Sequence, residues 1–290
     1  MEAALASIGE DCAAGPATDT AAIWPALAAV LAEPDARRKA DRARAAEASW
    51  NAGEIDVDLS LWRAPPRRPG RPARPTLVDP RHAPRRRLSS AEGRAALLHA
   101  VAHIELNAID LAFDMAARFA PALFALGEET GRAFLGDWIK VGGDEARHFL
   151  MIQGRLEALG RSYGDFDAHD GLWEAAEKTM GDPLARLAIA PLILEARGLD
   201  VAPGMRDRLS AAGDDESAAL LDTIYTDEKT HVAAGVQWFD TLCAARKLEP
   251  RAAFHALADE HFPAGLKAPF NEEGRRDAGL LPDFYKPLAR

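Results

Sequence analysis

A short motif that could bind metal occurs twice in this chain of 290 residues. Asp-Glu-x-x-His stands at residues 144–148 and again at 227–231. In a helix this spacing brings the glutamate and the histidine to one face, about one turn apart. Carboxylates and imidazoles that project together can ligate a metal ion. With 20 Glu and 8 His, composition alone gives about 0.5 matches to Glu-x-x-His, so the interpretation depends on partner residues.

Two further glutamates interrupt apolar stripes and could be those partners. Glu105 and Glu195 each have apolar neighbours three, four or seven residues away, which predicts that both carboxylates face a helix's buried side. An unpaired ionised carboxylate is very costly there, so we expect something to neutralise it. The apolar neighbours are Leu98, Val101, Ala102, Ile109 and Ala112 for the first, and Ala188, Leu192 and Leu199 for the second.

These observations predict a dinuclear metal centre. Four carboxylates balance two divalent ions, and two imidazoles complete the set. One Glu from each of two helices with Glu-x-x-His from each of two others is the arrangement of di-iron and di-manganese carboxylate bundles. We expect two iron ions, with manganese or a mixed pair as alternatives. The predicted ligands are Glu105, Glu145, His148, Glu195, Glu228 and His231.

Three neighbouring residues are candidates for a supporting role. Asp144 and Asp227 each lie four residues before a ligand histidine and could accept its second N–H. The alternative is that both are solvated and pair with Arg147 or Lys229. Tyr225, three residues before the second motif's glutamate, could stand beside the metals as a hydrogen-bond donor or radical-forming side chain, or be a core tyrosine.

Four long helical segments are expected to position these residues, which makes the fold class all-α. Pro121 should end or kink the first segment, and Gly160 should stop the second. The Gly- and Asp-rich connection at about 160–180 predicts a long crossover between helices 2 and 3 of a four-helix bundle spanning 90–248. The predicted helices cover about 90–119, 128–159, 183–199 (followed by Gly204) and 217–247.

Segments outside the bundle are expected to be extensions. Residues 1–59 predict a helical N-terminal extension with a break at Pro34. Residues 60–89 form an Arg/Pro-rich arm, expected on the surface of the bundle unless it is an ordinary solvated linker. Residues 249–290 predict a C-terminal extension packed on the bundle.

Composition narrows the function classes. The net charge is −10, yet residues 61–90 hold nine Arg against one acid, while residues 91–243 hold 26 acids against 13 Lys and Arg. The acidic body argues against general nucleic-acid affinity, and the arm keeps it open. No apolar run is long enough to cross a membrane, and the amino terminus lacks a basic leader, so we expect a cytoplasmic protein without a membrane partner. Two cysteines, Cys12 and Cys243, cannot form a cysteine metal knuckle.

Around these motifs the sequence resembles the ferritin-like superfamily, and most closely an uncharacterised bacterial family that neighbours the tRNA hydroxylase MiaE. The resemblance covers roughly residues 20–290 and implies that Glu145 and Glu228 bridge the two metals. It implies that Glu105 and His148 complete one metal, and Glu195 and His231 the other. The matching stretches are HAVAHIELNAIDLAFD (99–114), GDEARHF (143–149), LILEARGLD (192–200), DEKTHV (227–232) and FNEEGRR (270–276).

The ligand set favours an O₂-activating oxidoreductase, a monooxygenase-like hydroxylase that takes electrons from an external donor and acts on a small apolar substrate. One alternative is a non-catalytic metal-binding or iron-handling protein. Another, suggested by the resemblance and the arm, is a MiaE-like tRNA or nucleoside hydroxylase. A third is a helical bundle whose acids only pair with arginines. The sequence leaves the oligomeric state open.

Overall fold

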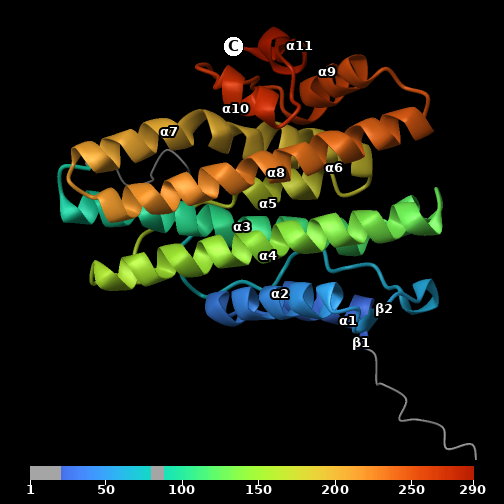
Figure 1. Ribbon diagram of the computed structural model, residues 1–290, viewed down its shortest axis with the longest axis horizontal. Coiled ribbons are helices and arrows are strands. Elements are labelled where there is room, and N and C mark those ends of the chain that lie inside the picture. The colour runs from blue at the N-terminus through green and yellow to red at the C-terminus, as the bar shows by residue number, and fades with distance from the viewer. Residues whose placement is uncertain (1–20, 80–87) are drawn as a thin grey trace, which may run out of the picture.

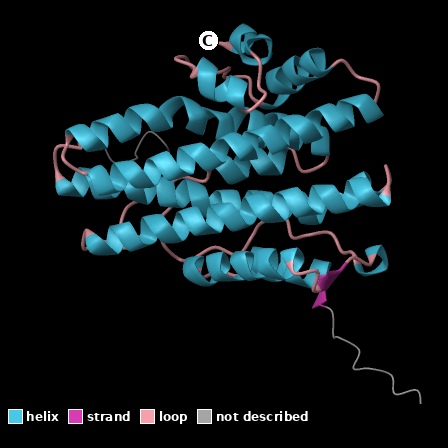
Figure 2. Ribbon diagram, viewed as in Figure 1, coloured by secondary structure: helices cyan, strands magenta, loops and turns pink. Residues whose placement is uncertain are grey.

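The computed structural model of the chain describes residues 21–79 and 88–290. The residues before 21, which include Cys12, and residues 80–87 of the predicted arm lie outside this description. In the described ranges the regular structure is almost entirely helical (Figure 2), which confirms the all-α prediction. The named strands are one parallel pair of two residues each, β1 (Ala21–Ala22) and β2 (Ile55–Asp56).

Four long helical segments run side by side as two hairpins (Figure 1). Apolar residues recur at helical spacing along each, so burying one face of every segment builds a shared core. The third segment is continuous in space but changes its winding in the middle. The segments are α3 (Ala91–Phe124), α4 (Glu128–Ala158), the series α6 (Pro183–Ile189), η3 (Ala190–Glu195) and α7 (Ala196–Ala211), and α8 (Asp215–Ala245).

Two helix ends lie beyond their predicted positions. The first helix continues through Pro121 to its end at Phe124, so Pro121 does not end it. The third segment runs past Gly204 to Ala211, because its apolar face extends to the fully buried Leu209 and tertiary packing outweighs local propensity. It is followed by Gly213, whose φ of +77° suits a helix-terminating glycine.

The middle of the third segment is a π turn, η3. The turn inserts extra backbone where Pro191 removes a hydrogen-bond donor. Helix α8 approaches it closely, since a Cβ added at Gly235 would lie 2.4 Å from Pro191 Cβ. The π turn therefore sits where α8 leaves no room for a side chain, and its last residue is Glu195.

The long crossover between α4 and α6 contains a further helix, α5 (Gly171–Lys178), which packs against α3. Trp173 of α5 is 1% exposed and contacts Leu111 of α3. The arm meets the same crossover: Val78 N donates to Ala168 O (2.8 Å), and Ala168 N donates to Thr76 O (3.0 Å). The arm and the crossover thus brace each other on one side of α3.

The extensions cover opposite outer faces of the two hairpins (Figure 1). At the N-terminal side, α2 packs on α4, and the buried Lys39 ammonium contacts the Asp110 carboxylate of α3. The helix break predicted at Pro34 lies between α1 and α2. The elements are α1 (Ile23–Ala32), α2 (Ala36–Asn51), η1 (Leu59–Leu61), α9 (Pro250–His261), α10 (Glu272–Asp277), α11 (Pro282–Tyr285) and η4 (Lys286–Leu288).

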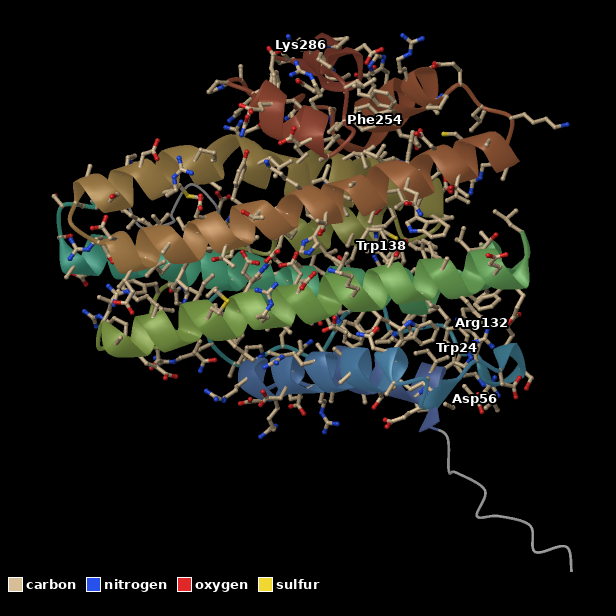
Figure 3. The ribbon with its side chains drawn as sticks, viewed as in Figure 1. Trp24, Asp56, Arg132, Trp138, Phe254 and Lys286 are labelled. Atoms are coloured by element: carbon tan, nitrogen blue, oxygen red, sulfur yellow. The ribbon has the colours of Figure 1, made fainter. Side chains whose placement is uncertain are left out.

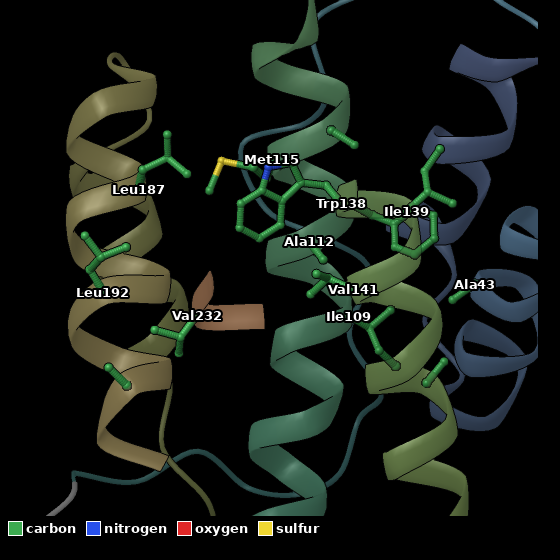
Figure 4. Close-up of a cluster of buried hydrophobic side chains, with 14 of the residues drawn as sticks. Ala43, Ile109, Ala112, Met115, Trp138, Ile139, Val141, Leu187, Leu192 and Val232 are labelled. Atoms are coloured by element: carbon green, nitrogen blue, oxygen red, sulfur yellow. The ribbon is translucent and has the colours of Figure 1, made fainter. Parts of the chain in front are cut away.

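One hydrophobic core joins these layers. Figure 4 shows Leu192 of η3, Ile109 of α3 and Trp138 of α4 around its centre. In Figure 3 Trp138 lies inside the body, while Lys286 lies at the outer edge of the C-terminal extension. Burying side chains of this size contributes about 1.5–3 kcal/mol each, so the core is a rigid frame for whatever polar residues it encloses.

Helix α3 is long and apolar enough to cross a membrane by length and composition. However, 89% of its most apolar stretch is buried inside the protein, as in the core helix of a soluble protein. Among residues 21–79 and 88–290, no other helix meets the same criteria.

Candidate metal centre

Four of the six predicted ligands converge tightly in the core. Glu105 of α3, Glu145 and His148 of α4, and Glu228 of α8 each offer one ligand atom, and these atoms lie within 4.8 Å of one another. All four side chains are buried. Such a buried group of three carboxylates and an imidazole could hold a metal ion.

Glu145 lies between the two motif histidines. Its Oε2 is 3.3 Å from Nδ1 of His148, and its Oε1 is 3.0 Å from Nδ1 of His231. Both imidazoles therefore turn the same nitrogen toward this carboxylate. Glu228 Oε2 also lies 3.6 Å from His231 Nδ1. The two Glu-x-x-His motifs thus meet at Glu145, which is fully buried.

Glu105 and Glu195 occupy unequal positions around this centre. Glu105 Oε2 is 3.3 Å from His148 Nδ1, and the residue is 2% exposed. Glu195 lies at the end of the π turn and is only half-buried, and both glutamates border a cavity. Neither Glu195 nor His231 belongs to the group that converges within 4.8 Å.

Several ligand atoms lack an aligned hydrogen-bond partner among the described residues. Buried polar atoms are almost always satisfied, so a cluster of unsatisfied ones needs an explanation. Oxygen and nitrogen donors of this kind suit iron or manganese, and two divalent ions would balance the four carboxylates. The residues present therefore fit bound metal. The atoms are Glu105 Oε2, Glu145 Oε1, Glu195 Oε2, Glu228 Oε2 and His231 Nδ1.

Burial holds protons on the outer carboxylates. Burial and the nearby Glu145 carboxylate raise the pKa of Glu105 well above its usual range and also raise the pKa of Glu228. Burial, followed by the charges of Glu228 and Glu145, raises the pKa of Glu195 to about 8. Each of these groups resists ionisation until a cation arrives.

The central carboxylate and the imidazoles shift the other way. Burial opposes ionisation of Glu145, but His231 and His148 outweigh it and lower its pKa well below the usual range. Burial disfavours the charged form of His148, but Glu105 and Glu145 outweigh it and raise the imidazole pKa to about 11. The pKa of His231 is also raised well above its usual value, because Glu145 and Asp144 outweigh its burial. Glu145 therefore favours its ionised form, and both imidazoles favour their protonated forms.

The two motif aspartates contact histidines, but in a crossed arrangement. His148 Nε2 hydrogen-bonds to Asp227 Oδ2 of α8 (3.0 Å), and His231 Nε2 to Asp144 Oδ2 of α4 (3.4 Å). Each aspartate thus contacts the histidine of the other motif rather than its own. A carboxylate on the outer nitrogen fixes the ring and directs the inner nitrogen toward a metal.

Arg147, the alternative partner predicted for these aspartates, contacts both of them as well. Arg147 Nη2 donates to Asp144 Oδ1 (3.0 Å) and to Asp227 Oδ2 (2.8 Å). Lys229 instead pairs with Asp277. Arg147 therefore links the two crossed pairs on the outer side of the histidines.

Tyr225 does not point to the candidate centre. Its hydroxyl accepts a hydrogen bond from Asn271 Nδ2 (2.9 Å) and lies against Gly274, both in the C-terminal extension. Three residues rotate a helix position by about 60° from the original direction, which here is enough to move Tyr225 onto the flank facing α10. These contacts favour the alternative of a packed tyrosine, and a role beside the metals stays a prediction.

His103 is a polar residue whose contacts the sequence did not reveal. Its ring nitrogens hydrogen-bond to the Tyr163 hydroxyl (2.8 Å) and the His169 carbonyl (3.0 Å), both in the crossover. Burial lowers its pKa to about 4, so the ring is neutral at pH 7. His103 thus fastens the crossover to α3, and only its place two residues before Glu105 could have drawn notice.

A cavity of about 280 Å³ borders the ligand cluster. It lies between α3, α7, α8 and the crossover, and Glu105, Glu195 and Glu228 form part of its wall. His148, His231 and their aspartates are not among its lining residues, although His103 and His169 are. The cluster therefore has one side that faces a cavity and another that faces the crossed Asp–His pairs.

Comparison with known proteins identifies one family and one relative that are similar to this chain. The family described as "Protein of unknown function (DUF455)" matches residues 32–286. An "Uncharacterized protein" of Haemophilus influenzae is 41% identical over 210 residues, which cover 72% of each chain. No solved structure matches the chain.

Proposed function

Because the chain belongs to the family described as "Protein of unknown function (DUF455)", we propose its function from its site: a dinuclear, O₂-activating oxidoreductase of ferritin-like architecture. We propose two iron ions as the metal, with manganese or a mixed pair as the alternative. An external electron donor would supply the reducing equivalents.

The position of Glu145 carries this proposal. One carboxylate has an oxygen within 3.3 Å of each of two imidazoles that come from different helices. A single metal would use only part of this set, whereas two metals that share Glu145 would use both histidines. The unsatisfied atoms of Glu105, Glu195 and Glu228 would supply the remaining ligands.

A bound pair of reduced metal ions of this type supplies electrons to O₂. The protein's own part is to hold and protect that centre. Asp144 and Asp227 orient the two histidines, and the raised pKa values of Glu105 and Glu195 mean that protons leave as metal enters. The apolar walls of the adjoining cavity exclude water from the side on which Glu105, Glu195 and Glu228 lie.

Non-catalytic iron handling is the main competing function, and the number of iron ions separates the two. An enzyme centre of this type saturates at about two ions per chain, while a storage protein continues to oxidise and retain iron beyond that. We therefore propose loading the metal-free protein with Fe²⁺ without oxygen, measuring the iron bound, and then adding O₂ in steps. The matched variants are Glu145→Ala and, for the control, exposed Glu157→Ala on the same helix.

The expected result is about two Fe²⁺ per chain and an optical change on exposure to O₂ that stops at that stoichiometry. Glu157→Ala should behave as the wild type, and Glu145→Ala should bind little iron. Less than about one iron per chain in the wild type, or full binding in Glu145→Ala, contradicts the two-metal proposal. Continued oxidation far beyond two ions would assign the protein to iron handling.

The arm's contacts disfavour the tRNA alternative. Arg68 pairs with Asp170 (2.9 Å) and Glu177 (3.2 Å), and Arg67 pairs with Glu177 (3.1 Å). Arg71 donates to Asn107 Oδ1 (2.7 Å). These three arginines are engaged within the protein, while Arg81, Arg85, Arg86 and Arg87 lie outside the described residues. Binding to bulk tRNA that weakens steeply with salt would restore this alternative.

A further inference from the structure

We propose that the cavity beside the ligand cluster binds an uncharged, apolar small molecule, and that Gly198 sets the size of the molecule it accepts. This inference rests on the proposed function only where it calls the bound molecule a substrate. The binding site and its size limit can be tested without any enzymatic turnover.

The cavity has the position a substrate site needs. Three of its wall residues, Glu105, Glu195 and Glu228, belong to the proposed metal ligands. Its opposite wall is the crossover, where Ala168 and Leu172 line it. A molecule in the cavity would therefore lie directly against the carboxylate side of the centre and be covered by a segment that the arm braces.

The walls select for apolar groups. Buried Val101, Ala108 and Leu111 of α3 face the cavity across from Leu221 and Ile224 of α8. At its edge, Ile104 is 48% exposed, which is unusual for a large apolar side chain and marks an apolar rim. Burying apolar surface here contributes about 25 cal/mol per Å², so an apolar occupant gains affinity from nearly every wall.

The charges around the cavity disfavour an ion. Apart from the ligand glutamates, its ionisable lining residues are His103, His169, Asp167, which is exposed, and Arg197. Arg197 Nη1 donates to Asp200 Oδ2 (3.2 Å) and to the Lys267 carbonyl (2.8 Å), which ties this guanidinium to the C-terminal extension. An organic anion would therefore meet a cation already held by other partners, beside three ligand glutamates. An ammonium would find ligand carboxylates whose charge two metal ions already balance. A neutral molecule therefore loses the least hydration free energy on entering the cavity.

Gly198 keeps the cavity open. It lies three residues after Glu195, so the two share a face of the third segment, and it lines the cavity. A Cβ added there would meet no atom within 4 Å, so a larger side chain can be accommodated by occupying empty space. Glycine in a helix interior costs about 1 kcal/mol relative to alanine. The packing of neighbouring residues does not require glycine at position 198. The space that glycine leaves in the cavity explains its presence.

The volume limits the occupant. About 280 Å³ lies just below the range of about 300–1,000 Å³ common for small-molecule sites. The cavity thus suits a short alkyl chain or a single ring system, or such a group at the end of a larger molecule. A leucine side chain at position 198 would remove a substantial part of this space.

The test uses octan-1-ol, octanoate and octylammonium as probes of one chain length and three charges. Their binding to the full-length, Zn²⁺-loaded protein at pH 7 is measured by titration calorimetry, with metal content determined for every sample. Gly198→Leu is compared with Gly204→Leu, because Gly204 is on the same helix, also has no atom within 4 Å of a built Cβ, and does not line the cavity.

Octan-1-ol should bind the wild type and Gly204→Leu equally, bind Gly198→Leu at least about tenfold more weakly, and bind more tightly than either ion. Tighter binding of octanoate or octylammonium overturns the selection for neutral molecules. Equal binding to both leucine variants overturns the role of Gly198, and no octan-1-ol binding to metal-loaded wild type overturns the site. If the wild type takes up no metal, the proposed function fails instead, while the same probes still test the cavity in the metal-free protein.

Discussion

The two hairpins contribute the same set of ligand types, yet they hold them differently. In the first, Glu105 lies on a regular helix, is 2% exposed and reaches to 3.3 Å from His148. In the second, Glu195 ends a π turn and is half-buried, although both glutamates border the cavity. The first half therefore holds its outer glutamate more tightly than the second.

This difference predicts separate tasks for the two halves. A carboxylate held against a histidine, as Glu105 is, gives a metal a fixed ligand. A half-buried carboxylate at the end of a π turn, as Glu195 is, can shift more easily. π turns are rare in proteins and often occur at functional sites, so the change of winding marks the half at which chemistry is expected.

The largest effect should come from Glu145, which both halves share. Glu145→Ala should lower the metal content after Fe²⁺ or Mn²⁺ loading from about two ions per chain to nearly none. The reason is that each histidine loses the carboxylate facing its Nδ1. Elemental analysis after gel filtration measures this, and retention of one full ion would mean that the halves bind independently.

Removing one outer carboxylate should affect metal binding differently in the two halves. Glu105→Gln should remove one ion outright, because Glu105 is the carboxylate held against His148 Nδ1 (3.3 Å). Glu195→Gln should keep two ions but weaken the second by roughly 10–100-fold, because the half-buried end of the π turn can adjust around the change. Calorimetric titration with Mn²⁺ distinguishes the two patterns. Equal losses in both variants would contradict the difference between the two halves.

The crossed aspartates give a smaller and more specific effect. Asp227→Asn should weaken metal binding at the half that contains His148, by roughly tenfold, although Asp227 belongs to the other motif. The effects of Asp227→Asn and Glu105→Gln on the free energy of metal binding should therefore be non-additive. The effects of Asp227→Asn and Glu195→Gln should be additive. Mn²⁺ affinities of the single and double variants complete both cycles. The reverse pattern would mean that each aspartate serves its own motif.

The smallest effect concerns a single proton. The pKa of Glu195 is about 8 in the metal-free protein, so the carboxyl holds a proton at pH 7 that metal binding displaces. At pH 9 the proton has already left. Metal affinity should thus rise with pH across this range, and Glu195→Gln should release about one proton fewer than the wild type at pH 7 and the same number at pH 9.

This proton count is measured by titrating metal into weakly buffered protein with a pH indicator. The exposed Glu157→Gln serves as the control and should match the wild type at both pH values. An unchanged count for Glu195→Gln at pH 7 would show that Glu195 does not lose a proton to the metal.

Helical periodicity was enough to predict the convergence of Glu105, Glu145, His148 and Glu228, because each interrupts or flanks an apolar stripe and buried faces must meet. The all-α class and the break at Pro34 followed from equally local signals. The prediction that the third helix ends before Gly204 was wrong. The burial of Leu209, which only the packed structure reveals, outweighs the local preference of glycine against helix.

The remaining features depend on how helices meet. The Asp144 and Asp227 contacts cross between α4 and α8, so their partners follow from the alignment of two helices rather than from spacing along one. The π turn depends on the close approach of Gly235 to Pro191. Tyr225 could have faced either side by spacing alone, and the C-terminal extension decided its direction.

The pairing of the arm with the crossover has a consequence for how the chain folds. The bridge between Leu77 and Ala168 encloses the whole α3–α4 hairpin. Contacts so distant in sequence carry a large loop-closure entropy, which the nearer contacts between α3 and α4 do not. The hairpin that carries Glu105, Glu145 and His148 can therefore form before the cavity wall closes, and we expect the nascent protein to acquire metal-binding residues earlier than a finished binding chamber.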